Sequence, residues 1–133
     1  MKTISLLFTL ILSALVGNAQ TYNNEWINYN NTYYKFNVGA TGLYRISQSS
    51  LSTAGLGGTD AANFQLWKNG VEVPLYTSVA TGILGPTDFI EFYGEVNDGS
   101  LDKQLYKTDL LQMSSKNSLY TDTAAYFLTV NTS

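Results

Sequence analysis

Residues 64–76 read Phe-Gln-Leu-Trp-Lys-Asn-Gly-Val-Glu-Val-Pro-Leu-Tyr, and they carry the clearest structural signal in the chain, that of a β-hairpin. Asn69-Gly70 separates two apolar runs, and this dipeptide favours a type I′ turn, in which both central residues need positive φ. A two-residue turn fixes the register of a β-hairpin, so we expect Trp67 to lie opposite Glu72. Because Pro74 has no N–H to offer a further strand, residues 71–76 are predicted to form an edge strand.

Further strands are expected on both sides of this hairpin. Apolar residues alternate with polar ones over residues 33–38 and return over 43–46, which is typical of half-buried strands. Two later apolar runs, 88–93 and 124–131, predict a central strand and a last strand. Ser47 as an N-cap and Gly55 as a terminator predict one short helix over 48–54. The pattern as a whole predicts an all-β domain, an antiparallel two-layer β-sandwich with one short helix.

The N-terminus has the features of a secretory signal peptide. Lys2 precedes an apolar run over residues 4–16, and small residues lead up to Ala19, after which we expect cleavage. The run is shorter than the ~20 residues that a membrane-spanning helix needs, so no membrane association is expected after cleavage. We therefore divide the chain into a signal peptide (1–19), a polar lead-in segment (20–32) and a β-sandwich module (33–131), and expect a secreted or cell-surface location.

Composition narrows the chemistry that the chain can perform. The chain contains no Cys and no His, so disulfides, imidazole metal ligands and nucleophilic triads built on these residues are unavailable to it. The net charge is −3 and the single arginine is Arg45, so no basic stripe is present to neutralise phosphates. We expect no nucleic-acid partner, no cofactor, no bound metal and no catalytic residues.

Five stretches, taken in order, resemble a known family. They read Tyr-Lys-Phe-Asn-Val-Gly-Ala-Thr-Gly-Leu-Tyr-Arg-Ile (34–46), Leu-Trp-Lys-Asn-Gly-Val-Glu-Val-Pro (66–74), Asp-Phe-Ile-Glu-Phe-Tyr-Gly-Glu-Val-Asn-Asp-Gly (88–99), Leu-Asp-Lys-Gln-Leu-Tyr (101–106) and Leu-Tyr-Thr-Asp-Thr-Ala-Ala-Tyr-Phe-Leu-Thr-Val (119–130). Together they look like the N-terminal, prodomain-like β module that precedes gingipain-type cysteine peptidases, and that the type IX secretion sortase and related exported surface proteins also carry. The resemblance implies an exported leading module that is the N-terminal part of a longer protein, assists its folding or keeps it latent, and has the downstream domain of the same polypeptide as its partner.

Aromatic side chains give the first candidate site. Trp67 and Tyr76 are predicted to share one face of the hairpin with Glu72, and Tyr93 is added from the strand over 88–93. Such a face indicates either docking onto the downstream domain or stacking of a surface glycan. Both alternatives remain open, and docking is the favoured one.

Two weaker patterns lie near the C-terminus. Calcium prefers hard oxygen ligands, and Glu95, Asn97, Asp98 and Asp102 could supply them, although a turn explains Asn-Asp-Gly more simply. Asp122-Thr123-Ala124 fits a short bacterial O-glycosylation pattern, which makes Thr123 a candidate for modification.

The sequence therefore predicts a non-catalytic exported module with a folding, latency or docking role. The alternative is a carbohydrate-binding or adhesion module that uses an exposed aromatic face.

Overall fold

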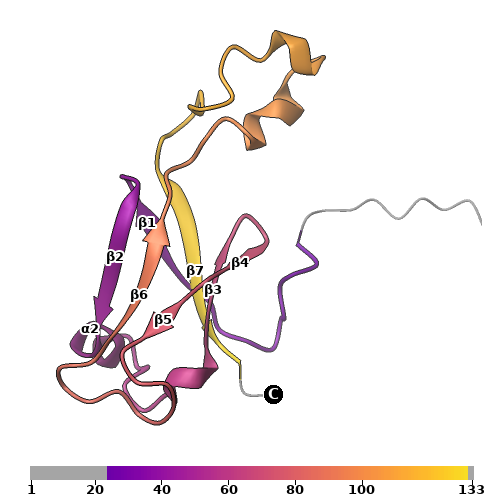
Figure 1. Cartoon of the computed structure of the whole chain (residues 1–133). Coiled ribbons are helices and arrows are strands. Elements are labelled where there is room, and N and C mark those ends of the chain that lie inside the picture. Colours follow the sequence, from indigo (N-terminus) through magenta and orange to yellow (C-terminus); the bar gives the residue numbers. More distant parts are fainter. Residues whose placement is uncertain (1–23, 132–133) are drawn as a thin grey trace, which may run out of the picture.

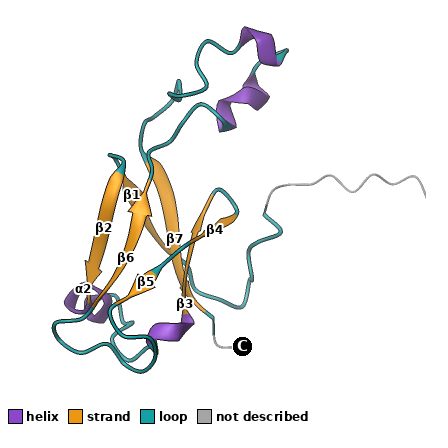
Figure 2. Ribbon diagram, in the orientation of Figure 1, coloured by secondary structure: helices purple, strands orange, loops and turns teal. Residues whose placement is uncertain are grey.

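The computed structural model describes residues 24–131 of the chain. The predicted signal peptide and the first four residues of the lead-in segment lie outside the described residues. The described part consists of strands joined by turns, with one α-helix and three short 3-10 helices (Figures 1 and 2). In chain order the elements are β1 (Tyr34–Val38), β2 (Gly42–Ser47), α2 (Gln48–Thr53), η1 (Ala61–Asn63), β3 (Phe64–Lys68), β4 (Val71–Val73), β5 (Tyr76–Thr77), β6 (Phe89–Gly94), η2 (Leu101–Leu105), η3 (Asp109–Leu111) and β7 (Ala124–Val130).

The strands form two antiparallel sheets. One sheet has four strands in the order β1-β7-β3-β4, and the other has three in the order β2-β6-β5. The last strand, β7, lies between β1 and β3, and β6 is the central strand of the smaller sheet. The predicted all-β sandwich with one short helix is confirmed.

The β3–β4 hairpin has the predicted register. Trp67 lies opposite Glu72, and the turn residues Asn69 and Gly70 have φ angles of 50° and 78°. Both angles are positive, as a type I′ turn requires.

The prediction that residues 71–76 form a single edge strand is wrong in the extent of the strand. β4 ends at Val73, while β5 belongs to the other sheet, where Tyr76 lies opposite Glu91. The chain crosses between the sheets at Pro74, whose missing N–H cannot extend a ladder, and at Leu75, which packs against the core. The result is two short edge strands, β4 and β5, in place of one longer strand.

The helix ends as its sequence predicts. The Ser47 hydroxyl accepts a hydrogen bond from Ser50 N, and Gly55 has a φ of 83°. Leu56 N donates to Leu51 O (2.8 Å) and Gly55 N to Ser52 O (3.0 Å), which is a Schellman motif. Leu51 and Leu56 are both buried, so the motif also closes one end of the core.

The core lies between the two sheets. Its buried apolar residues come from both sheets, from α2 and η1, and from the connecting segments; they are Val38, Leu51, Leu56, Ala61, Phe64, Leu66, Leu84, Ile90, Phe92, Ala124, Tyr126 and Leu128. The Tyr126 hydroxyl accepts a hydrogen bond from Glu95 N (2.8 Å) and donates to Glu95 O (3.1 Å). A buried ring thereby fixes the backbone where the chain leaves β6.

Candidate functional site

The outer face of the four-stranded sheet is covered by the lead-in segment. Trp26 stacks on Trp67 with ring centroids 5.4 Å apart and an interplanar angle of 26°, and it also contacts Phe127 (5.6 Å) and Tyr33 (5.5 Å). Thr129 Oγ1 donates to Thr32 O (2.9 Å) and holds the segment against β7. Trp67 is therefore half-buried, and its Nε1 is buried without a hydrogen-bond partner.

The outer face of the three-stranded sheet is open. Tyr76 and Tyr93 are 59% and 57% exposed on it. Arg45 forms an ion pair with Glu91 (2.8 Å), and its guanidinium lies 3.7 Å from the centre of the Phe89 ring.

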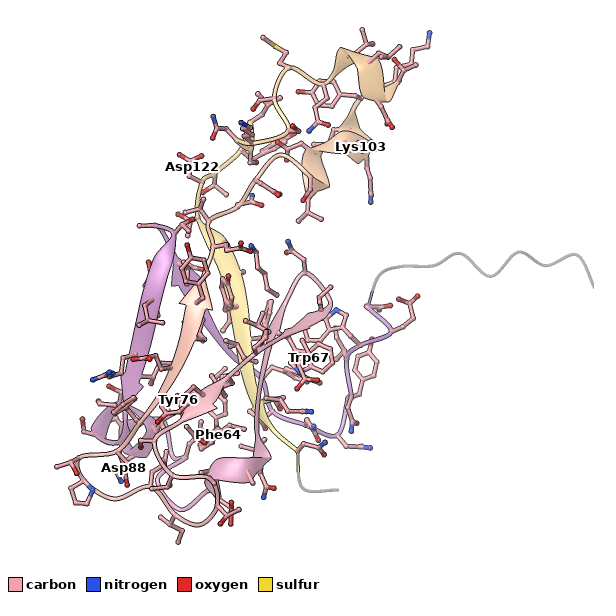
Figure 3. All side chains as sticks on the ribbon, viewed as in Figure 1. Phe64, Trp67, Tyr76, Asp88, Lys103 and Asp122 are labelled. Carbon is pink, nitrogen blue, oxygen red and sulfur yellow. The ribbon has the colours of Figure 1, made fainter. Side chains whose placement is uncertain are left out.

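The four predicted face residues are thus divided between the two sheets. Trp67 and Glu72 are cross-strand neighbours on one sheet, whereas Tyr76 belongs to β5 and Tyr93 to β6 of the other. Figure 3 shows Trp67 and Tyr76 well apart. The prediction that Trp67 and Tyr76 share one hairpin face is wrong, because the crossing at Pro74 separates them. That the lead-in segment covers Trp67 was not predicted from sequence. The available signal was Trp26, an aromatic residue in an otherwise polar segment.

A long segment between β6 and β7, residues 95–123, projects beyond the ends of the strands (Figure 1). We call it the arm. It contains η2 and η3. At its base, Asn97 N donates to Asp122 O (2.8 Å) and Asn97 Nδ2 to Thr121 O (3.0 Å), so the two ends of the arm are joined.

Polar groups hold the arm together from inside. The Asp102 carboxylate is only 5% exposed and accepts hydrogen bonds from Ser118 Oγ (3.1 Å) and Leu119 N (2.6 Å). The Gln112 side-chain amide donates to the carbonyl oxygens of Gly99 and Ser114. These bonds connect the first half of the arm with the second.

Apolar side chains of the arm face outward. Among the residues of the arm, all of which the structure describes, Gly99 and Asp102 are buried and no apolar side chain is. Leu110 is 96% exposed and Met113 86%. Exposed large apolar residues of the arm are Leu101, Leu105, Leu110, Leu111, Met113, Leu119 and Tyr120. The arm therefore buries a carboxylate while seven large apolar side chains lie among its exposed polar residues, which is the reverse of where these residue types usually lie.

The four calcium candidates have separate structural roles. The Glu95 carboxylate lies 3.5 Å from Lys68 Nζ, the Asn97 amide donates to Thr121, and Asp102 holds the interior of the arm. Hydrogen bonds from the Ser100 hydroxyl, and then from its backbone N–H, lower the pKa of Asp98. Within residues 24–131 no three acidic, His or Cys residues form a group that could hold a metal ion. Thr123 is exposed at the base of the arm, directly before β7, so its modification stays a prediction.

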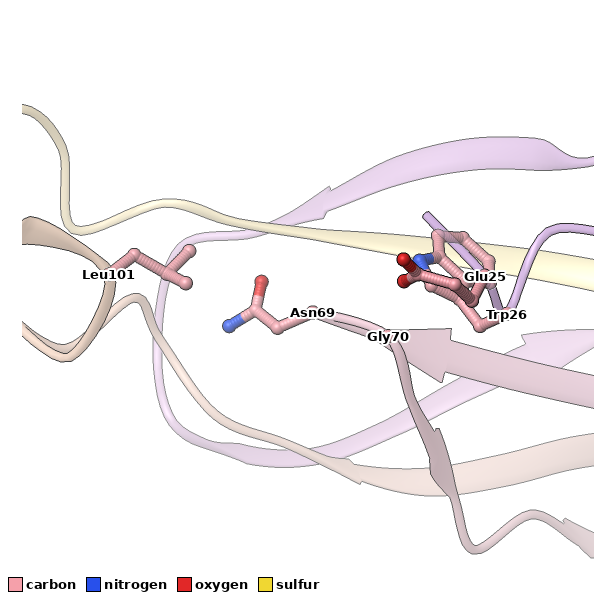
Figure 4. Close-up of a pocket in the computed structure, with 5 residues that line it drawn as sticks. All are labelled: Glu25, Trp26, Asn69, Gly70 and Leu101. Carbon is pink, nitrogen blue, oxygen red and sulfur yellow. The ribbon is translucent and has the colours of Figure 1, made fainter. Parts of the chain in front are cut away.

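Two cavities open on the surface. The first, of about 510 Å³, is lined by Glu25, Trp26, Asn69, Gly70 and Leu101, which come from the lead-in segment, the β3–β4 turn and the arm (Figure 4). The second, of about 400 Å³, has a mostly apolar lining from β1, β2, β7 and α2. Neither cavity was predicted from sequence, because each is assembled from segments far apart in the chain.

Comparison with protein-family models, with curated proteins and with solved structures gives no match. In the described part of the chain, no helix has the length and hydrophobicity needed to cross a membrane. The resemblance to the gingipain-type N-terminal module therefore stays a prediction.

Proposed function

We propose that this chain is a non-catalytic, exported β-sandwich module that docks onto the following region of the same polypeptide. On this proposal it is the leading module of a gingipain-like or type IX-secreted surface protein, with a folding or latency role. The signal-peptide pattern and the ordered family resemblance support export and the leading position.

The observation that carries the proposal is the set of seven exposed large apolar side chains on the arm. Burying one leucine side chain in a contact is worth roughly 1.5–3 kcal/mol, so seven exposed large apolar side chains on one segment represent a large unused binding energy. Exposed apolar patches of this kind mark interaction surfaces.

A protein partner fits the arm better than a fluid apolar surface. The Asp102 and Gln112 hydrogen bonds fix the arm in one conformation before binding. Such preorganisation lowers the entropy cost of fitting a partner of defined shape. Asp109 at η3 is neutralised by Lys103 (2.7 Å), so an apolar partner surface meets no unpaired carboxylate there.

Several acidic residues of the described chain are also occupied in structural contacts, in keeping with a non-catalytic role. The Asp88 carboxylate accepts hydrogen bonds from Ser78 Oγ (2.9 Å) and Gly85 N (2.7 Å), and Glu91 is paired with Arg45. Asp102 is bonded inside the arm.

The test begins with the coding sequence beyond Ser133. The region it encodes is produced as a separate polypeptide, and its affinity for the module is measured by calorimetry. Replacing Leu110 and Met113 by Ser removes two exposed side chains and should weaken association about 100-fold or more.

The matched control replaces Leu43 and Ile83 by Ser, since these side chains are also exposed but lie outside the arm. This control should bind as the wild type does. The proposal is overturned by a stop codon directly after Ser133, by a following region that does not associate, or by equal binding of the two double variants.

A further inference from the structure

The cavity beside Trp26 has the chemistry of a sugar site. We infer that it binds a saccharide that contains an N-acetylhexosamine. Its volume of about 510 Å³ lies within the roughly 300–1,000 Å³ range of small-molecule sites. This site is distinct from the hairpin face that the sequence predicted for glycan stacking, and the inference does not depend on docking by the arm.

Trp26, which lines the cavity, is held by aromatic neighbours. Trp26 is stacked on Trp67 and packed against Phe127, so its indole ring is fixed to the four-stranded sheet. A Cβ on Gly70 would lie 3.0 Å from Trp26 Cδ1, so a glycine at this turn position lets the backbone approach the ring. Asn69, with a φ of 50°, presents its amide at the same turn. Figure 4 shows Glu25 and Trp26 on one side of Asn69 and Leu101 on the other.

Each lining group suits one part of an N-acetylhexosamine. An aromatic ring packs against the C–H face of a sugar, as amphipathic rings do at ligand sites. Carboxylate and amide groups such as those of Glu25 and Asn69 exchange hydrogen bonds with hydroxyl and acetamido groups. Leu101 supplies the apolar contact for the acetamido methyl.

The charge of the lining favours a neutral ligand. Of the residues that line this cavity in the described chain, Glu25 is charged and negative, and no Lys or Arg is among them. Phosphates, sulfates and uronic acids would therefore meet a lining carboxylate of their own charge sign. A neutral acetamido sugar meets no such repulsion.

Tryptophan fluorescence offers a direct readout, because Trp26 and Trp67 are the two tryptophans of the chain and are stacked at this site. The purified protein is titrated with N,N′-diacetylchitobiose and, separately, with cellobiose, which lacks the acetamido groups. We expect a saturable fluorescence change and a calorimetric signal with the first disaccharide, and binding at least several-fold weaker with the second.

Two variants and one control assign the binding to the cavity. Asn69→Gly keeps the positive φ but removes the amide, and Glu25→Gln removes the charge; each should weaken binding about three- to tenfold. Asp122→Asn, which also removes a negative charge but lies outside the cavity lining, should bind as the wild type does. Near-ultraviolet circular dichroism checks that all three variants are folded.

The inference is overturned if diacetylchitobiose does not bind, if Asn69→Gly and Glu25→Gln bind it as tightly as the wild type, or if cellobiose binds equally well. These outcomes leave docking by the arm untouched, because Leu110 and Met113 do not line the cavity.

Discussion

Gly70 shows how one residue links the hairpin to the cover over its sheet. Its φ of 78° lies in the left-handed region, and a Cβ at this position would lie 3.0 Å from the Trp26 ring. The positive φ was predictable from Asn69-Gly70, but the contact with Trp26 was not, because nothing in the local sequence shows which segment covers the turn.

Replacing Gly70 by Ala should therefore destabilise the protein. Backbone strain at positive φ costs about 1–3 kcal/mol, and the new methyl group also displaces Trp26. Chemical denaturation should show the loss in the free energy of unfolding, and tryptophan fluorescence should shift as Trp26 moves away from Trp67. Asn69→Gly serves as the control, because glycine accepts the positive φ and should change stability little. If Gly70→Ala changes neither the free energy of unfolding nor the tryptophan fluorescence, both the backbone strain at this position and the close approach of Trp26 are contradicted.

At the scale of elements, predictions based on local periodicity succeeded and those that required long-range information did not. β1, β2, α2, β6 and β7 lie where alternation, capping residues and aromatic runs predicted them. The strand over 71–76 was predicted from continuity of the apolar pattern, yet Pro74 and Leu75 carry it from one sheet to the other. Local sequence does not contain the positions of the two sheets, so it could not reveal this crossing.

The arm was missed as an element because its stabilising groups are polar and distant in sequence. Asp102 meets Ser118 and Leu119 across the arm, and no periodic apolar pattern marks these contacts. The sequence presents Asp102 as one of several acidic residues, and it predicts for this residue a weak candidate calcium ligand rather than a buried structural group. Its burial is visible only once the arm is closed.

Asp102→Ala should loosen the arm and leave the sandwich intact. The change leaves Ser118 Oγ and Leu119 N without their acceptor, at a cost of about 1–3 kcal/mol to the local structure. Amide hydrogen exchange should become faster over residues 95–123 and stay unchanged in β3, β6 and β7. Asp122→Ala, an exposed carboxylate of the same arm, should affect exchange little. If the Asp102 variant unfolds globally, or if amide exchange over residues 95–123 does not change, the carboxylate does not hold the arm together independently of the sandwich.

For the molecule as a whole, the proposed function assigns stability to the sandwich and interaction to the arm. The buried side chains of the two sheets form the core, whereas the exposed leucines of the arm contact little. The same substitution should therefore have different consequences in the two places.

We compare the effect of a leucine-to-alanine change in the core, Leu66→Ala, with the same change in the arm, Leu110→Ala. Leu66 is 0% exposed, so truncation should lower the free energy of unfolding by about 2–5 kcal/mol. Leu110 is 96% exposed, and its truncation should change stability by less than about 0.5 kcal/mol. Urea denaturation of both variants measures the difference. Similar losses at both positions would mean that the arm packs against the sandwich.

On the function that we propose, a fixed polar framework holds the apolar side chains of the arm out in solvent, ready for a protein partner. Solution NMR with a soluble paramagnetic probe tests this most directly on the wild-type protein, through relaxation of the leucine methyl groups. We predict strong relaxation for Leu105, Leu110 and Leu111, weak relaxation for Leu51 and Leu66, and a protected amide at Leu119, which donates to Asp102. Arm methyl groups as shielded as those of Leu66, or a Leu119 amide that exchanges as in an unfolded chain, would contradict the claim.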